Sequence, residues 1–531
     1  MAQYGTGYLS KARRDAIEKR YKEEKRRQPG ITFPSAIKQE HVFIIRFDIA
    51  DNIFKDKSNS HKIVKNGLKK LCELFDMLDK DKKKIEKISD DGDIKLLPLS
   101  NFNFSSTIGF GIGFFEKLDI ARTNRPNNLK EMPDNFGLGD PNPYVLRQTD
   151  FILQLGANVD YVNRWIFQNS DVISGKQKEM KSNLYQEQLR KSKPDQTQDV
   201  PQDILTAISG WTKIADIHTG FQRIDGKNLL GFNDGISNPD RLSNTVVWTT
   251  IKEEKEKFKD GTYMVFQKIE HDLEQWQNLQ IEKQEQWIGR SKWTGLLLGT
   301  LSKEEDRKLG FDMHSDEPLV RERALKKWKR LYKDQQDPET KFFDNNKTQF
   351  KNIQLECPVW SHVRKANPRQ ADGAPKSLIF RRGYPYIEGG ELNGKSNSGL
   401  LFICFQKNIE NGFENIKKNF LNNKNFPVPD LRANFKPEDS RIRHQHGRFS
   451  SDNIRRLKQL DINFNYAHGI SKHESNYEMQ NTGKDGLSGP SELGVYAGEP
   501  IPITTTLGGG YYFIPPIPNR KIANISEQFF N

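Results

Sequence analysis

The order of apolar and polar positions predicts strands and helices in the first half of the chain. Residues 41–49 (HVFIIRFDI) form an apolar run that is typical of a strand, and apolar residues recur at roughly helical spacing over 63–88. The segment NFNFSSTIGFGIG alternates like a strand, and DFILQLGANVDYVNRWIFQ begins as an apolar strand and continues with a helical pattern. These patterns predict strands and helices built on one sheet.

A similar order returns in the second half. GTYMVFQKIEHDLEQWQNL predicts a strand followed by a helix, and PKSLIFRRGYPY predicts another strand. GLLFICFQKNIENGFENIKKNFL predicts a strand that runs into an amphipathic helix, and GGGYYFIPP predicts the last strand. The sequence therefore predicts two α+β modules of similar design.

Polar stretches suggest where these modules begin and end. Residues 1–40 are highly charged and contain the turn signal Gln-Pro-Gly, so they are predicted to form an arm outside the core. A polar stretch at 174–202 is predicted to be a long loop, and a charged segment at about 300–352 a surface insertion with one helix. The expected organisation is the arm, a first module over 41–202, and a second module over 203–531 that carries the insertion and a turn-rich C-terminal region.

Composition narrows the class of protein. The chain has 531 residues, with 34% hydrophobic and 29% charged, and no apolar run approaches the roughly 20 residues of a membrane span. The basic N-terminus lacks the apolar stretch of a secretory signal, so a cytoplasmic location is expected. Cys72, Cys357 and Cys404 fit neither a disulfide framework nor a Cys-x-x-Cys metal site. The net charge of +13 could attract anionic partners, although a solvated Lys-rich surface is the more ordinary explanation.

Two motifs carry groups that could act on a ligand. In GFNDGISNPD, Asp234 stands between glycines that would let the backbone approach a ligand closely, although Asn-Asp-Gly alone is ordinary turn chemistry. In CPVWSHVRKANPR, His362 is followed by Arg364 and further basic residues, which suits a cofactor with carboxylates. A phosphate or nucleic-acid site is the alternative interpretation of the basic cluster.

Two strand motifs could form the wall of a pocket. In SLIFRRGYPYIEGG, strand alternation places Arg381 and Arg382 on opposite faces, so only one of them can enter a given pocket. An inward arginine requires a counter-charge or a charged ligand. In GLLFICFQ, Leu400 and Phe402 share a face that is either an apolar pocket wall or part of the core.

Taken together, these motifs resemble a known family. The order GFNDGISNP, QEQWIGRSKWTG, SHVRKANPR, FRRGYPY and GLLFICFQ is similar to the series that marks the DyP-type (dye-decolorizing) haem peroxidases. The resemblance is close over about 200–300 and 353–406 and weak over the first 200 residues, and the charged insertion departs from the family's compact linker.

The resemblance implies a fold, a cofactor and a set of roles. The fold would be a pair of ferredoxin-like α+β modules of the dimeric alpha-beta barrel superfamily, with one haem b per chain held by the second module. The family's axial iron ligand corresponds to His362, its distal acid to Asp234 and its distal arginine to Arg381. Arg364 resembles a haem propionate partner, and Leu400 and Phe402 resemble the apolar wall of the peroxide pocket.

The implied activity is a peroxidase reaction. Hydrogen peroxide would be reduced via a ferryl intermediate, and dye-like or phenolic donors would be oxidised, with surface Tyr or Trp residues relaying electrons from bulky donors. The proximal histidine should donate its second ring N–H to a carboxylate, for which Asp485 and Glu492 are candidates. A homo-oligomer is compatible with the sequence.

Two other functions remain open. The first is a haem-handling or haem-sensing protein of the same fold. The second is a basic nucleic-acid-binding protein, which is weakened because no exposed aromatic strand signature is evident.

Overall fold

The structure is a computed structural model of the chain. The residues that it describes are 26–32, 39–79, 84–88, 94–98, 105–140, 143–157, 204, 206–223, 225–336, 356–357, 361–368, 377–392, 395–422, 503–518 and 521–530.

The first module is built on four antiparallel strands. They are β1 (His41–Ile49), β4 (Ser105–Phe110), β5 (Phe151–Ala157) and β6 (Thr212–Phe221), in the order β6-β1-β5-β4. Helix α3 (Lys57–Asp79) connects the first two of them. Counted along the chain, these are the fourth, first, third and second strands of the module. This is the order of a ferredoxin-like sheet, in which the first and third strands are central. We call these strands the first half-sheet.

The second module repeats this strand order. Its strands run β11-β7-β10-β8, so the first and third strands along the chain are again central. The chain order is β7 (Thr262–His271), α9 (Leu273–Asn278), α10 (Ile281–Ile288), β8 (Phe380–Arg381), β9 (Tyr384–Leu392), β10 (Lys395–Gln406), the helix η6 (Glu410–Leu421) and β11 (Thr504–Ile514). We call these strands the second half-sheet. The fold is thus a pair of ferredoxin-like modules, as the sequence predicted.

The two half-sheets join at both of their edges. β11 pairs with β4 through Phe513 and Phe110, which makes the described strands one nine-stranded sheet. At the other edge β6 lies against β9, where a Cβ on Gly220 would be 2.6 Å from the Cβ of Tyr384. Apolar residues on one face of both half-sheets then share a single buried cluster, which includes Val42, Ile44, Ile152, Met264, Phe266, Tyr384, Tyr386, Leu401, Ile403, Tyr512 and Ile514.

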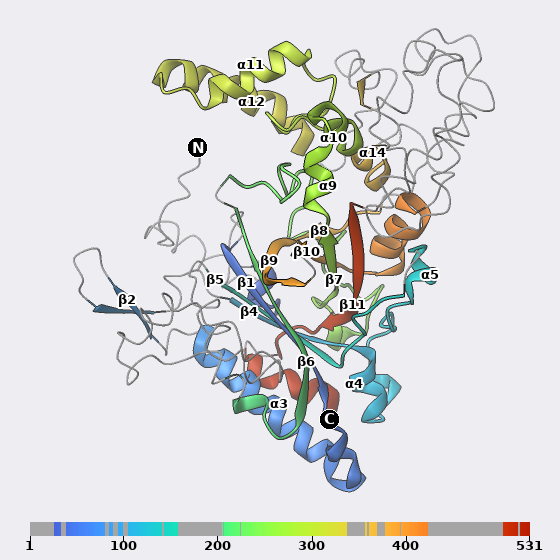
Figure 1. Cartoon of the computed structure of the whole chain (residues 1–531). Helices are drawn as coiled ribbons and strands as arrows, with labels where there is room; N and C mark the ends of the chain where they lie inside the picture. The colour runs from blue at the N-terminus through green and yellow to red at the C-terminus, as the bar shows by residue number, and fades with distance from the viewer. Residues whose placement is uncertain are drawn as a thin grey trace, which may run out of the picture.

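The opposite face of the first half-sheet is covered by α3. Leu68, Leu71 and Phe75 of this helix are buried in the same cluster as Phe43 and Phe47 of β1. Figure 1 shows α3 at one end of the molecule, beside the C-terminus. Burial of one apolar stripe of a long helix supplies the main stabilisation of this face.

Shorter elements complete the described chain. They are α2 (Pro29–Thr32), η1 (Asp51–Lys55), β2 (Lys84–Ile88), β3 (Ile94–Pro98), α4 (Ile112–Lys117), η3 (Arg122–Asn124), α5 (Asn135–Leu138), η4 (Glu256–Phe258), α14 (His362–Ala366), η10 (Ile522–Ser526) and α18 (Glu527–Phe530). In the described part of the chain, each helix is too short or too polar to cross a membrane.

The helix predicted over 63–88 is shorter than expected. It ends at Asp79, and Lys84–Ile88 is a strand that pairs with Ile94–Pro98. The letters KIEKI place isoleucine at 85 and 88, a spacing of three that continues the preceding helical pattern, so no local strand signal marked these residues.

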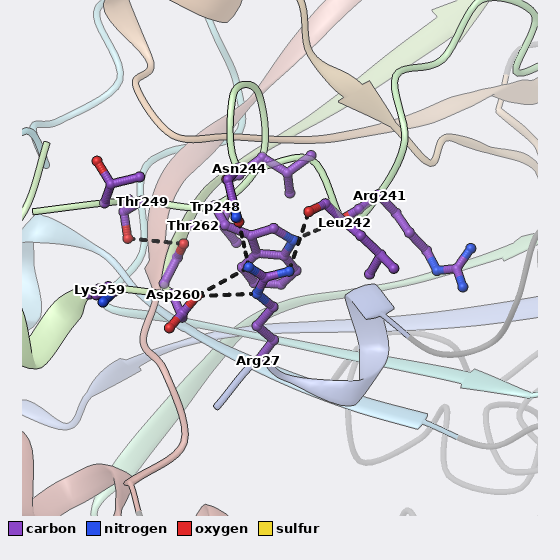
Figure 2. Close-up of polar contacts among 12 residues, drawn as sticks. Arg27, Arg241, Leu242, Asn244, Trp248, Thr249, Lys259, Asp260 and Thr262 are labelled. Carbon is purple, nitrogen blue, oxygen red and sulfur yellow. Dashed lines mark hydrogen bonds and ion pairs between the residues drawn. The ribbon is translucent and has the colours of Figure 1, made fainter. Parts of the chain in front are cut away.

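The N-terminal arm is not wholly outside the core, which corrects the expectation for 1–40. Residues 28–32 are buried, and the Gln28 side chain joins the two half-sheets: it donates to the carbonyls of Ile108 and Pro515 at 3.1 and 3.0 Å and accepts from the Ile108 amide at 2.8 Å. Arg27 lies over the Trp248 ring and pairs with Asp260 at 3.2 Å (Figure 2). Because the arm is highly charged, its sequence did not indicate that residues 28–32 would be buried.

The end of the first module also lies later than the sequence suggested. β6 pairs with β1 along its whole length, so the first half-sheet extends to Phe221 rather than stopping at residue 202. The predicted loop at 174–202 lies outside the described residues. So do residues 427–502, which make up most of the predicted C-terminal region.

The charged insertion contains two helices where the sequence predicted one. α11 (Lys303–Met313) begins with a capping box at Ser302, and α12 (Pro318–Gln336) packs against it through Leu309 and Ala324. Figure 1 shows the pair at the end of the molecule opposite α3, close to α10 and α14. The high charge of the segment obscured the first helix because few of its positions are apolar.

Candidate active site

A cavity lies against the outer face of the second half-sheet. β7 contributes Gln267, Ile269 and His271 to it, and β10 contributes Leu400 and Phe402. The remaining wall comes from the 228–237 loop, α14, η6 and the segments next to them, with the residues Asn228, Leu230, Phe232, Asn233, Asp234, Gly235, Ile236, Ser237, Ile288, Arg290, Leu297, His362, Val363, Ala366, Asn367, Ser377, Leu378, Ile379, Arg381, Gly383, Phe413, Ile416, Lys417 and Leu421. The lining is mainly apolar, with a few polar and cationic groups.

His362 lies on the cavity wall as the first residue of helix α14. Burial, together with the nearby positive charges of Arg381, Lys417 and Lys365, lowers the pKa of its imidazole to about 3. The ring is therefore neutral at ordinary pH, which is the state in which an imidazole nitrogen can ligate a metal.

The position of α14 is set by a tight turn after α10. Gly289 has a φ of 91° in the left-handed region, and a Cβ there would lie 2.5 Å from Val363 and 2.6 Å from the Ser361 hydroxyl. Any larger residue would push against the segment that carries His362. The first glycine in WIGRSKWTG, Gly289, is thus explained by close packing against the segment that carries His362.

Arg381 also lines the cavity and is held by the Gly-rich loop of GFNDGISNPD. Its amide and Nε donate to the Asn238 Oδ1 at 3.1 and 3.3 Å, and its own carbonyl accepts from the Asn238 Nδ2 at 2.7 Å. Another guanidinium nitrogen donates to the Ile236 carbonyl at 2.7 Å. The distant motifs GFNDGISNPD and FRRGYPY are therefore fastened to each other.

Asp234 lines the same cavity with an exposed side chain. The loop turns there through Gly231 and Gly235, which have φ values of 90° and 77°, and the Gly235 amide donates to the Asp234 Oδ1 at 2.8 Å. Burial lowers the pKa of Arg381 whereas the charge of Asp234 raises it, so the two side chains are within electrostatic reach. The structure thus brings His362, Asp234 and Arg381 to one cavity.

Strand alternation separates the two neighbouring arginines as expected. Arg382 points away from the cavity and donates to the carbonyls of Gly30 and Ile31 in the arm. Leu400 and Phe402 share the cavity face of β10, opposite Ile269 and Gln267 of β7.

Arg364 lies elsewhere. It is buried and donates to the Cys357 carbonyl at 2.7 Å, and it is not among the residues that line the cavity. Its role as a carboxylate partner stays a prediction. The carboxylates suggested for the second nitrogen of His362, Asp485 and Glu492, lie outside the described residues.

The residues that line this cavity lie in a part of the chain that matches a known protein family. The family model described as "Dyp-type peroxidase, C-terminal" matches residues 225–427, which include Asp234, His362, Arg381, Leu400 and Phe402. This region of the chain is therefore similar to the C-terminal part of the DyP-type peroxidases.

Relatives in sequence also match part of the chain. Proteins named deferrochelatase from Escherichia coli (strain K12) and from Shigella flexneri are each 32% identical over 217 residues, which is 39% of this chain and 42% of the relative. The match spans less than half the length of these curated relatives.

Solved DyP-type structures show the same fold over nearly the whole chain. The DyP-type peroxidase from Streptomyces coelicolor has a TM-score of 0.52 and 17% identity, and covers 94% of both chains. An ancestral D-type dye decolorizing peroxidase has a TM-score of 0.54 and 18% identity, with 95% of this chain and 98% of the other covered. The DyP-type fold therefore includes the first module, where the sequence resemblance was weak.

Three ionisable residues of this cavity were not singled out in the sequence. His271 is buried, and burial lowers its pKa to about 4, so the cavity contains a second neutral imidazole. Alternation along β7 from Ile269 could have predicted its direction. Arg290 and Lys417 come from WIGRSKWTG and from η6, and only the tertiary structure brings them together.

The charge of the cavity is positive. Lys417 pairs with Asp140 at 3.0 Å, whereas for Arg290 and Arg381 no carboxylate of the described residues lies within 4 Å. Burial lowers the pKa of Arg290 to about 10, so both guanidinium groups are charged at neutral pH. Buried cations of this kind favour an anionic ligand.

Proposed function

We propose that this chain is a haem-dependent peroxidase that reduces hydrogen peroxide and oxidises an organic donor, dye-like or phenolic. The observation that supports it most strongly is the meeting of a neutral His362 with Arg381 and Asp234 in one largely apolar cavity. The proposed cofactor is haem b, one per chain.

The residues of the cavity fit such a group. Haem has an apolar macrocycle, an iron that accepts an imidazole nitrogen, and two anionic propionates. The apolar side chains of β10 and η6 suit the macrocycle, and the neutral His362 suits the iron. The buried guanidinium of Arg290, which has no carboxylate partner in the described part of the chain, suits a propionate. Once bound, haem would supply the redox chemistry.

The protein side chains would then handle the protons and the charge. Asp234 would accept a proton from one oxygen of hydrogen peroxide and deliver it to the other, which is general acid–base catalysis by a carboxylate. Arg381 would stabilise the negative charge that develops on the departing oxygen, and its hydrogen bonds to Asn238 and Ile236 hold it in place beforehand.

Absorption spectroscopy and steady-state turnover test this function. The purified full-length chain supplied with haem should show a Soret band and should oxidise a dye when peroxide is added. Arg381→Leu should retain haem and lose about 10²- to 10³-fold in turnover, the typical effect of removing one charge-stabilising donor. Arg323→Leu, the same change at an exposed position of α12, is the control and should be unaffected.

Two results would contradict the proposal. A chain that shows no Soret band after haem is supplied would exclude a haem protein and would return attention to a basic nucleic-acid-binding protein. Full activity of Arg381→Leu would remove the assigned role of Arg381.

A second candidate function is haem handling without significant peroxide turnover. It is favoured by the sequence relatives, which are named deferrochelatase. Incubation of the protein with haem and a donor, followed by measurement of released iron and of oxidised dye, separates the two. Iron release with negligible dye oxidation would support this second function.

A further inference from the structure

One glutamine of the charged insertion is buried next to the cavity. Gln335 lies in the last turn of α12, and its side chain is 1% exposed, whereas the polar side chains before it on the helix are largely exposed. A buried residue must satisfy its polar groups within the protein. The hydrogen-bond partners of Gln335 therefore show which segments the end of α12 contacts.

The first partner belongs to the loop that carries Asp234. The Ser237 hydroxyl donates to the backbone carbonyl of Gln335 at 2.7 Å, and Ser237 has a φ of 62° in the left-handed region. A non-glycine residue in that conformation persists only where its surroundings hold it. The end of α12 thus supports the loop three residues after Asp234.

The other partners belong to the turn that carries Arg290. The Gln335 Oε1 accepts from an Arg290 guanidinium nitrogen at 3.2 Å and from the Leu297 amide at 2.9 Å. The Gln335 Nε2 donates to the Thr300 hydroxyl at 2.9 Å. The same guanidinium nitrogen of Arg290 donates to the Gly295 carbonyl at 2.9 Å, so Gln335 and the turn together set the direction of this cavity cation.

The insertion does not depend on Gln335 for its attachment. The Trp328 indole N–H donates to the Thr294 carbonyl at 2.8 Å, and Leu309 and Ala324 share a buried cluster with Leu296 of the turn. These contacts lie two or more helical turns before Gln335. The polar contacts of Gln335 therefore add precision to the site rather than holding α12 on the protein.

We propose that Gln335 is a positioning residue of the candidate active site. Its backbone carbonyl holds the Asp234 loop through Ser237, and its side-chain amide directs the Arg290 guanidinium, so the insertion supports residues of the cavity wall. This inference rests on the proposed peroxidase function for its effect on turnover, but its structural part can be tested without haem.

Two variants separate the two contacts. Gln335→Leu removes the hydrogen bonds to Arg290, Leu297 and Thr300 and keeps the carbonyl that Ser237 uses. Ser237→Ala removes the contact to the loop and keeps the amide. Gln335→Glu is the conservative variant because it retains an acceptor for Arg290 and Leu297, and Lys333→Ala, at an exposed position of the same helix, is the matched control.

The first measurement is amide hydrogen exchange of the full-length chain without haem. Ser237→Ala should speed exchange in 231–240 about 10-fold, and Gln335→Leu should do the same in 290–297, while β1 should be unchanged in both. Gln335→Glu should stay within about 3-fold of the wild type in 290–297 because the main acceptor is kept. Unchanged exchange of both segments in both variants would overturn the inference.

The second measurement is steady-state peroxidase kinetics of the haem-loaded protein. Gln335→Leu should lower kcat about 10-fold with the KM for the dye unchanged, because a small misplacement of the site affects the reacting step more than donor binding. Gln335→Glu should recover most of the loss. A Gln335→Leu variant with wild-type kcat would also overturn the inference.

Failure of the proposed function gives a different pattern. A wild-type chain with no turnover, combined with faster exchange in the variants, would refute the peroxidase and leave the positioning role intact. If Gln335→Leu does not fold, Gln335→Glu and Ser237→Ala decide the question by exchange and kinetics.

Discussion

The two half-sheets of this protein have the same strand order and opposite uses of their outer faces. In the first, the long helix α3 covers the face, and Phe43 and Phe47 are fully buried against it. In the second, the first strand is followed by the short helices α9 and α10, and Ile269 and His271 of β7 face a cavity instead of a helix.

Strand order alone therefore does not create the site. One fold can hold a solid core or a ligand cavity, depending on the length of the covering helix and on the residues at alternate strand positions. In the second half-sheet those positions include Gln267 and His271 on β7, whereas β1 of the first carries Phe43, Ile45 and Phe47 there. The following predictions test this contrast.

The largest expected effect is on the stability of the filled face. Phe151→Ala should lower the free energy of unfolding by about 3–5 kcal/mol, because a fully buried ring that stacks on Phe47 at 4.8 Å is lost. Phe402→Ala, on the cavity wall of the second half-sheet, should cost about half as much, since that ring already faces open space. Urea unfolding of both variants measures this, and equal losses would mean that the two faces are packed alike.

The next effect concerns which cavity imidazole matters. His362→Ala should weaken haem retention by more than about 100-fold, because even indirect changes around a metal ligand cost about 10- to 100-fold. His271→Ala is the matched control in the same cavity and should retain the Soret band. Haem titration followed by absorption spectroscopy checks both, and loss of the band in His271→Ala alone would exchange the two assignments.

A pH dependence should also distinguish the two faces. The folded pKa of His271 is about 4, below the ordinary 6.5, so the unfolded chain takes up a proton below pH 6.5 that the folded chain does not. The stability present above pH 6.5 is therefore lost as the pH falls to about 4, by roughly 3 kcal/mol. Urea unfolding at pH 7.5 and 4.5 should show a smaller difference in His271→Leu, and an unchanged difference would show that His271 is not the group involved.

The smallest effect concerns the seam between the half-sheets. Gln28→Ala should lower the free energy of unfolding by about 1–2 kcal/mol, because the buried Ile108 and Pro515 backbone groups lose their partner. Arg27→Ala, which breaks a partly exposed ion pair with Asp260 beside it, should cost less. Thermal unfolding compares the two, and a larger loss in Arg27→Ala would show that the seam does not depend on Gln28.

Local sequence patterns predicted most of the fold. β1 was predicted with the bounds that it has, and the strands at 262–271 and 504–514 were expected, because short apolar runs are typical of strands that are buried on both faces. The errors fell where local pattern was weak or mixed: the KIEKI strand, the first helix of the insertion and the buried arm segment. β6 went unpredicted, since its burial is irregular along an edge strand.

The candidate site shows the same division between what local sequence predicted and what it did not. The sequence by itself determined the chemical groups: His362 with its basic neighbours, the Asp234 turn, and the opposite directions of Arg381 and Arg382, because spacing and alternation are local properties. The folded structure was needed to show that Asn238 holds Arg381, that His271 and Arg290 share the cavity, and that Gln335 contacts Arg290 from the insertion. Those contacts join residues about 45 to 143 positions apart, and no local pattern encodes a hydrogen bond over such a separation.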